Sequence, residues 1–167
     1  FKIGKNTIAN YLGYLRETLL VSFVETHSYS EKTIMQTPRK VYFVDNFFLS
    51  RYSKSSTNIG RLMENTVFTH LRRLQNRKPL LQIYYWRDYQ QNEVDFVLRD
   101  GLDVRALIQV SFISDVGELN QREVRALIKA SGELKCDNLL CLTWDYEGKK
   151  DFTWRRTART VQFVPLW

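Results

Sequence analysis

Three strand-like segments lie within residues 81–112, which read LQIYYWRDYQQNEVDFVLRDGLDVRALIQVSF. The second segment contains the run Glu93-Val94-Asp95-Phe96, whose alternation predicts one apolar and one polar strand face. The third contains Leu107-Ile108 in a more continuously apolar run, which is typical of a buried strand. We place the three strands at 81–87, 93–98 and 104–112.

The segments on either side of these strands complete an α/β pattern. A long helix is predicted before them, from about Ile59 to Asn76. After them we expect a helix at 117–130, a buried strand at 139–143 and a last strand at 160–164. An apolar strand directly after a helix indicates a parallel crossover unit beside an antiparallel meander. The predicted fold is a mixed sheet flanked by helices, in the α/β class.

The N-terminal part has a different pattern. Apolar residues at three- and four-residue steps predict a helix over 6–17, and β-like runs follow at 19–24 and 40–45, separated by a polar stretch. A helix followed by two strands matches the latter half of a winged helix, although a helix and hairpin that cap the next domain would read the same. Residues 50–58 are serine-rich and linker-like. We therefore divide the chain into a partial winged-helix-like segment at 1–50 and a second domain at 51–167.

Composition narrows the class of protein. The chain has 167 residues, 44% of them apolar, and a net charge of +7. No apolar run approaches the roughly 20 residues that cross a bilayer, so we expect no membrane partner. Two cysteines, Cys136 and Cys141, cannot form a disulfide framework, which favours a reducing, cytoplasmic compartment. The chain begins without Met and without an apolar signal region, so we expect a fragment of a longer protein, and its charge suggests a polyanionic partner such as DNA.

The acidic residues suggest a metal site. Glu64 falls within the apolar arc of the long helix, where a carboxylate needs a partner, a metal or a marginal position that reaches water. Asp95 lies on a strand, where acids are disfavoured unless that face is open to solvent. A hairpin between its strand and the next would bring it near Gln109. Hard cations prefer oxygen ligands, so Glu64, Asp95, Gln109 and the Val110 carbonyl could together hold Mg²⁺.

This pattern resembles the PD-(D/E)XK nuclease superfamily. Its signature is a helix Glu, a strand Asp and a strand (Glu/Gln)-x-Lys, on a core of one helix, three strands, a helix and a strand. The resemblance implies a restriction-endonuclease-like fold in which acidic residues hold Mg²⁺ for phosphodiester hydrolysis. The corresponding positions here, which we take as the candidate catalytic residues, are Glu64, Asp95, Gln109 and Ser111.

A wider set of motifs resembles one family, the C-terminal domain of unknown function attached to archaeal and bacterial AAA+ ATPases. That family places a winged-helix segment before the nuclease-like domain and a P-loop ATPase before both. The resemblance therefore implies the chain's own ATPase domain as an upstream partner, and ATP as a ligand of that absent domain alone. The motifs are Thr7-Ile8-x-x-Tyr11-Leu12-x-x-Leu15, Lys40-x-Tyr42-Phe43-x-Asp45, Gly60-x-Leu62-x-Glu64-Asn65, Tyr85-x-Arg87 and Glu93-Val94-Asp95-Phe96-Val97.

One departure from the nuclease pattern bears on activity. Ser111 stands where the pattern has Lys, and serine carries no charge to stabilise the transition state. Gln109 in place of Glu removes a negative charge, which weakens metal affinity. Two functions therefore stay open: a Mg²⁺-dependent DNA phosphodiesterase, and a catalytically silent nuclease fold that binds DNA or docks a protein. DNA binding by the N-terminal helix, as in a transcription factor, is a third hypothesis.

Other cations could take part in either function. Lys129, on the helix after the three strands, could replace the missing lysine or be merely solvated. Arg87 fits contact with a phosphate or a carboxylate. With Lys5 these two residues form our candidate set for nucleic-acid contact, and a homo-oligomer is compatible with the sequence.

Overall fold

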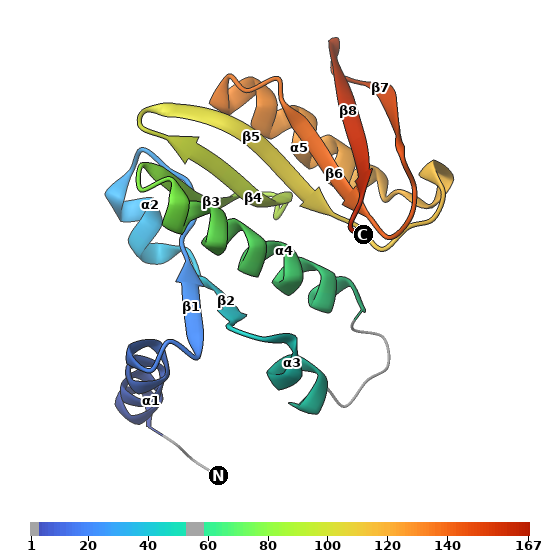
Figure 1. Cartoon of the computed structure of the whole chain (residues 1–167). Helices are drawn as coiled ribbons and strands as arrows, with labels where there is room; N and C mark the ends of the chain where they lie inside the picture. The colour runs from blue at the N-terminus through green and yellow to red at the C-terminus, as the bar shows by residue number, and fades with distance from the viewer. Residues whose placement is uncertain (1–3, 53–58) are drawn as a thin grey trace.

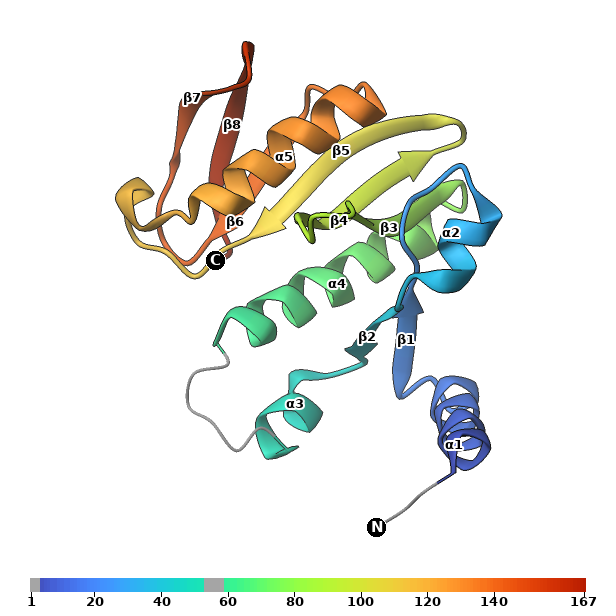
Figure 2. The same cartoon turned by 180° about the vertical axis from the view of Figure 1, so that it is seen from behind.

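The structure is a computed structural model that describes residues 4–52 and 59–167 (Figures 1 and 2). None of the described helices is long and apolar enough to cross a membrane. In chain order the elements are α1 (Lys5–Glu17), β1 (Val21–Val24), α2 (Glu31–Gln36), β2 (Lys40–Phe43), α3 (Asn46–Tyr52), α4 (Ile59–Arg77), β3 (Leu81–Arg87), β4 (Glu93–Asp100), β5 (Asp103–Val110), η1 (Val116–Glu118), α5 (Gln121–Leu134), β6 (Leu139–Thr143), β7 (Gly148–Trp154) and β8 (Thr157–Pro165).

Six strands form one mixed sheet in the order β3-β4-β5-β6-β8-β7. The pairs β3-β4, β4-β5 and β7-β8 are antiparallel, whereas β5-β6 and β6-β8 are parallel. Helix α5 makes the crossover from β5 to β6. The predicted α/β class, with its meander and its parallel crossover, is confirmed. Strand β7 was not predicted, because its residues are partly or fully exposed and carry no apolar pattern.

The two long helices cover opposite faces of this sheet (Figure 1). On one face α4 contributes Met63, Val67 and Phe68 to a buried cluster that includes Ile108 of β5. On the other face α5 packs on a second cluster; its buried apolar residues are Val124, Ala126, Leu127, Ile128, Ala130 and Leu134. Burying a large aliphatic or aromatic side chain contributes roughly 1.5–3 kcal/mol, so these two interfaces hold the sheet between the helices.

A β-bulge interrupts the pairing of β3 with β4. Tyr84 lies opposite Val97 and Trp86 opposite Val94, so the pair Asp95-Phe96 faces the single residue Tyr85. The simple alternation predicted for this strand is therefore wrong. Val94 packs in the α5-side cluster and Phe96 in the α4-side cluster, because a bulge shifts the inward and outward phase of a strand.

The N-terminal part contains a separate two-stranded antiparallel sheet, β1-β2. The connection between these strands was expected to be a polar stretch alone, but it contains helix α2, capped by the Ser30 side chain on the Thr33 amide. Residues 50–52, which we assigned to a linker, belong to α3, and residues 53–58 lie outside the described part. The predicted domain boundary after residue 50 therefore falls within α3. The winged-helix assignment stays a prediction.

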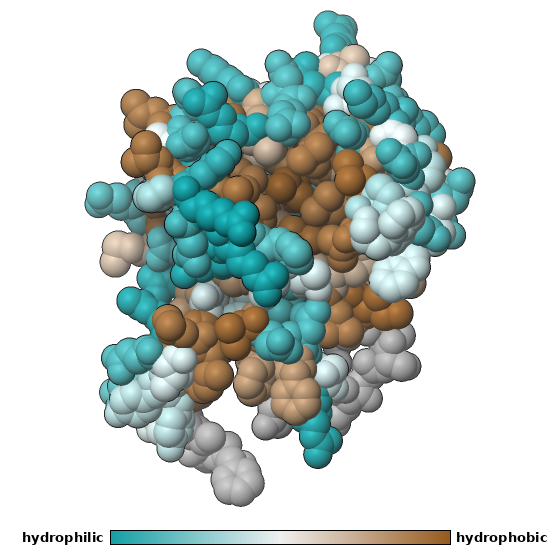
Figure 3. Space-filling model, viewed as in Figure 1, coloured by the Kyte–Doolittle hydropathy of each residue, from teal (hydrophilic) through white to brown (hydrophobic). Residues whose placement is uncertain are grey.

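Helix α1 forms as predicted but buries none of its residues. Its apolar stripe is exposed, with 47% of Ile8 and 59% of Tyr11 accessible to solvent. Figure 3 shows apolar surface at the lower left, where α1 and β1 lie, as well as across the middle of the same face.

Candidate functional site

Lys40 lies at the centre of an acidic cluster. Its Nζ is 2.9 Å from Glu64 Oε1, 2.8 Å from Glu93 Oε1 and 2.9 Å from Asp95 Oδ1. An ammonium has three N–H donors, so three carboxylates match its full capacity. Only 18% of the Lys40 side chain and 11% of the Asp95 side chain remain exposed, which weakens solvent screening of these charges. We call these four residues the Lys40 cluster.

Three separate elements bring the Lys40 cluster together: β2 supplies the lysine, α4 supplies Glu64, and β4 supplies the other two acids. Tyr42, two residues after Lys40 on β2, donates a hydrogen bond of 2.6 Å to Glu64 Oε1. The neighbouring Asn65, 1% exposed, ties the backbone of β2 to α4. It accepts from Phe43 N at 2.8 Å and donates to Phe43 O at 3.1 Å. The adjacent α4 residues Glu64 and Asn65 thus both hold β2. Glu64 bonds to side chains of the strand, and Asn65 bonds to its backbone.

Asp95 is held from the other side by β5. Its Oδ2 accepts hydrogen bonds from Gln109 Nε2 at 2.7 Å and from Val110 N at 2.9 Å. The predicted proximity of Asp95 and Gln109 is confirmed. A carboxylate only accepts, so the Gln109 amide must turn its nitrogen to Asp95. Gln109 Oε1 is then buried, without a partner among the described residues.

The pKa values in the cluster reflect burial and charge together. Burial works to lower the pKa of Lys40, but the charges of Asp95, Glu64 and Glu93 outweigh it and hold the pKa above its ordinary value. Burial and the neighbouring Glu64 carboxylate raise the pKa of Tyr42. Burial also raises the pKa of Asp95 above its ordinary value, with Lys40 opposing the rise and Glu64 adding to it. Lys40 therefore stays protonated and Tyr42 stays a hydrogen-bond donor at neutral pH.

This arrangement does not fit the predicted Mg²⁺ site while Lys40 is in place. The lysine occupies the oxygens of Glu64 and Asp95 that a cation would need. Gln109 presents its nitrogen to Asp95, and the Val110 N–H also donates to that carboxylate. Within residues 4–52 and 59–167, no group of three His, Cys, Asp or Glu side chains is placed to hold a metal ion.

Ser111 lies just beyond this cluster, at the end of β5. It is 7% exposed, its N–H donates to Leu142 O at 2.9 Å, and its hydroxyl faces Glu123 of α5. Burial raises the pKa of Glu123, and the Ser111 hydroxyl opposes the rise. A hollow of about 330 Å³ opens beside these residues; Gln91, Glu93, Asp95, Gln109, Asn120, Arg122 and Glu123 line it.

The other predicted cations lie outside the Lys40 cluster. Lys129 Nζ is 2.6 Å from Asp88 Oδ2, so this residue does not stand in for the missing lysine. Arg87 borders the cluster, with its Nε 3.8 Å from Glu93 Oε2. Lys5 begins the exposed helix α1. Lys40 was not among the predicted site residues, although it lies two positions before Tyr42 on a strand and therefore shares that residue's face.

Fold and site together define an α/β domain whose acidic cluster binds a lysine from an N-terminal strand. The chain belongs to the family described as "Domain of unknown function (DUF4143)", whose profile matches residues 59–166. An uncharacterized protein of Methanocaldococcus jannaschii is 35% identical over an alignment of 175 positions, and the alignment covers 99% of this chain. The match spans only 36% of that relative, so the chain corresponds to about a third of its length.

One solved structure also resembles the fold weakly. It is an assembly of Thermococcus gammatolerans McrB AAA+ hexamers with bound McrC. The superposition has a TM-score of 0.40 at 14% identity and covers 64% of this chain and 28% of the other.

Proposed function

We propose that this domain is a nuclease-like module that binds DNA and does not cleave it while Lys40 occupies the acidic cluster. The observation that carries the proposal is the set of three bonds from Lys40 Nζ to Glu64, Glu93 and Asp95. These bonds use all three donors of the ammonium, so Lys40 has none left for a water or a phosphate oxygen. Ser111 supplies no other charge at the position of the motif lysine.

The nuclease-like assignment rests on the order of elements and on the motif positions. A helix, three strands, a helix and a strand carry Glu64, Asp95 and Gln109, and Gln109 is bonded to Asp95. The resemblance to the PD-(D/E)XK superfamily and to domains attached to AAA+ ATPases supports a place beside an ATPase domain. A homo-oligomer and a cytoplasmic location belong to the same proposal.

A basic stripe on α5 supports DNA as the ligand. Arg122, Arg125 and Lys129 follow at three- and four-residue steps, so they share one side of the helix. Arg122 borders the acidic hollow, and the other two line a neighbouring hollow of about 240 Å³. Aromatic rings accompany the cations there: the Arg125 guanidinium is 4.5 Å from the Trp154 ring centroid, and Lys129 Nζ is 5.0 Å from that of Tyr89. Interleaved cations and aromatic rings suit phosphates and unstacked bases.

Two measurements on the same samples test this proposal: fluorescence anisotropy with labelled DNA, and gel analysis after incubation with Mg²⁺ or Mn²⁺. The proposal predicts binding whose log affinity falls steeply with log salt, and DNA that stays intact. A flat salt response or no binding would instead favour protein docking.

Mg²⁺-dependent phosphodiester hydrolysis is the second candidate. It is favoured by the convergence of Glu64 and Asp95, from α4 and β4, on one cation. It requires Lys40 to leave, so that Glu64, Asp95, Gln109 and the Val110 carbonyl become available to the metal. DNA cleavage by the wild type that Asp95→Ala abolishes would establish this function and overturn the first.

A further inference from the structure

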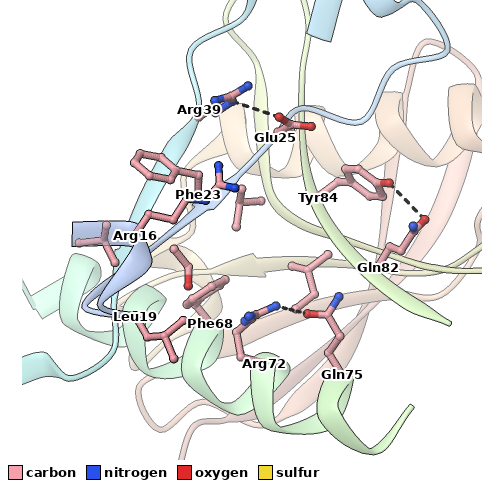
Figure 4. Close-up of a pocket in the computed structure, with 14 residues that line it drawn as sticks. Arg16, Leu19, Phe23, Glu25, Arg39, Phe68, Arg72, Gln75, Gln82 and Tyr84 are labelled. Carbon is pink, nitrogen blue, oxygen red and sulfur yellow. Dashed lines mark hydrogen bonds and ion pairs between the residues drawn. The ribbon is translucent and has the colours of Figure 1, made fainter. Parts of the chain in front are cut away.

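A third hollow, larger than the two described above, lies away from the Lys40 cluster, between β1 and β3 (Figure 4). It measures about 460 Å³. Strand residues 21–25 line one side and 82–84 the other, while α4 contributes Phe68 and Arg72. A space of this size is in the range of peptide and ligand sites.

The two strands that flank the hollow meet at one end only. Thr26 and Tyr85 form an isolated parallel bridge. Its hydrogen bonds run from Tyr85 N to Glu25 O at 3.1 Å and from His27 N to Tyr85 O at 2.6 Å. Residues on the N-terminal side of this bridge, on both strands, are not paired with each other. The hollow lies between them. β3 is an edge strand of the six-stranded sheet, and β1 has β2 as its partner on one side.

Successive residues of a strand direct their backbone N–H and C=O groups to opposite edges. On both strands, this alternation turns some backbone groups toward the hollow. Leu20 O accepts from Val44 N, and Glu25 O accepts from Tyr85 N on the opposite edge, so Phe23 shares the edge of Glu25. On β3, the backbone of Tyr85 makes its hydrogen bonds on the edge opposite β4. Leu81 O accepts from Gln75 Nε2 at 2.8 Å on the same edge. Ile83 lies between those two and presents its N–H and C=O to the same edge.

The charges around the hollow indicate the chemistry of the partner that it would bind. Arg16, Arg39 and Arg72 line it, and Glu25 is the one acid among the described lining residues. Glu25 Oε1 is 3.0 Å from Arg39 Nε, and Arg72 donates to Gln75 Oε1 (Figure 4). Among the described residues, no carboxylate pairs with Arg16 or Arg72. Apolar side chains, among them Leu19, Val21 and Ile83, line the hollow beside these charges.

We propose that this hollow binds an extended acidic peptide segment of a partner protein, which adds as a strand between β1 and β3. Its backbone pairs with the edges at Phe23 and Ile83, its apolar side chains pack on Leu19, which is 73% exposed, and its carboxylates meet Arg16 and Arg72. Strand addition of this kind draws affinity from main-chain bonds and specificity from alternate side chains. The inference goes beyond the proposed function, because it uses no residue of the Lys40 cluster or the α5 stripe.

The test uses a fluorescein-labelled peptide about eight residues long that alternates aspartate and valine. Two control peptides carry lysine for aspartate, or N-methyl groups on alternate backbone nitrogens. Anisotropy is measured with the wild type, Arg72→Glu, Arg16→Glu and the control Arg73→Glu, whose exposed arginine does not line the hollow. Hydrogen exchange of the wild type with and without peptide then locates the binding.

The aspartate peptide is expected to bind, and each hollow variant to weaken it by at least about fivefold, whereas Arg73→Glu changes affinity less than about twofold. Amide protection is expected at 21–25 and 81–85. Equal binding of the N-methylated peptide, equal loss in Arg73→Glu, or protection on α5 in place of the hollow would overturn the proposal. So would failure of the aspartate peptide to bind more tightly than the lysine peptide.

Discussion

Lys40 and Asp95 are 55 positions apart in the chain, and Lys40 Nζ lies 2.9 Å from Asp95 Oδ1. This contact joins the small N-terminal sheet to the bulged strand of the main sheet. It also places a cation at the predicted metal site. The N-terminal segment is therefore part of the acidic site.

Replacing the lysine should destabilise the fold. Lys40→Met keeps the aliphatic length but leaves Glu64, Glu93 and Asp95 facing one another without a counter-charge. Removing one partner of a largely buried charge cluster costs roughly 3 kcal/mol. Urea denaturation of this variant, compared with Lys32→Met on the exposed side of α2, measures the cost. A loss below about 0.5 kcal/mol would contradict the role given to Lys40.

Tyr42→Phe removes the hydroxyl that donates to Glu64 Oε1. Tyr42 is 4% exposed, so the loss of this bond to a charged acceptor should cost about 1.5–3 kcal/mol. Tyr84→Phe is the matched control, because Tyr84 is only half-buried and its hydroxyl bonds to Gln82 and Arg99 on its own sheet, with no carboxylate among its partners in the described residues. The control should change the free energy of unfolding by less than about 0.5 kcal/mol. Equal losses of unfolding free energy in both variants would mean that the bond to Glu64 contributes no more than the bonds of the Tyr84 hydroxyl.

The α5 stripe should govern DNA affinity. Charge reversal in Arg122→Glu or Arg125→Glu is expected to weaken binding and to lower the slope of log affinity against log salt by about one per lost phosphate contact. Arg73→Glu on α4, across the sheet, changes the net charge equally and serves as the control. If all three variants weaken DNA binding alike, net charge and not the stripe accounts for the affinity.

Asp88 predicts a specific dependence of stability on pH. Burial works to raise the pKa of Asp88, but hydrogen bonds from Asn92 and Lys129 outweigh it and lower the pKa below its ordinary value. A lowered carboxyl pKa stabilises the fold above about pH 4, and this contribution disappears as the pH falls through the folded-state value. The difference in unfolding free energy between the wild type and Asp88→Asn should therefore become smaller as the pH falls below about 5. A difference that stays constant would show that the charge of Asp88 contributes no stability.

Much of the fold was predictable because its elements have strong periodic patterns. Helix α4 carries buried apolar residues at regular steps, strands β3 to β6 contain apolar runs, and all of them lie close to the predicted bounds. β7 and α2 were missed because each is exposed or short and lacks such a pattern. The bulge at Asp95 was missed because it depends on pairing with Tyr85 across the sheet, which local alternation does not encode.

The site was predictable in part for the same reason. The hairpin that joins Asp95 to Gln109 follows from strand order alone. The contact of Lys40 with these residues follows from how β2 packs on α4, and Asn65 fixes that packing through the backbone of Phe43. Lys40 looks like an ordinary solvated strand lysine until this long-range packing is known.

Calorimetric titration of Mn²⁺ into the wild type and Lys40→Met shows whether Lys40 and a metal compete for the oxygens of the acidic cluster. Lys40→Met/Glu93→Gln, which removes one charge of each sign, serves as a second variant if Lys40→Met does not fold. If Lys40 and the metal compete, the wild type should bind no Mn²⁺ and the lysine-free variants should bind it at one site, which is lost again when Asp95→Asn is added. Mn²⁺ binding to the wild type as tight as to the variants would contradict this competition, because the lysine and the metal could not then share the same oxygens.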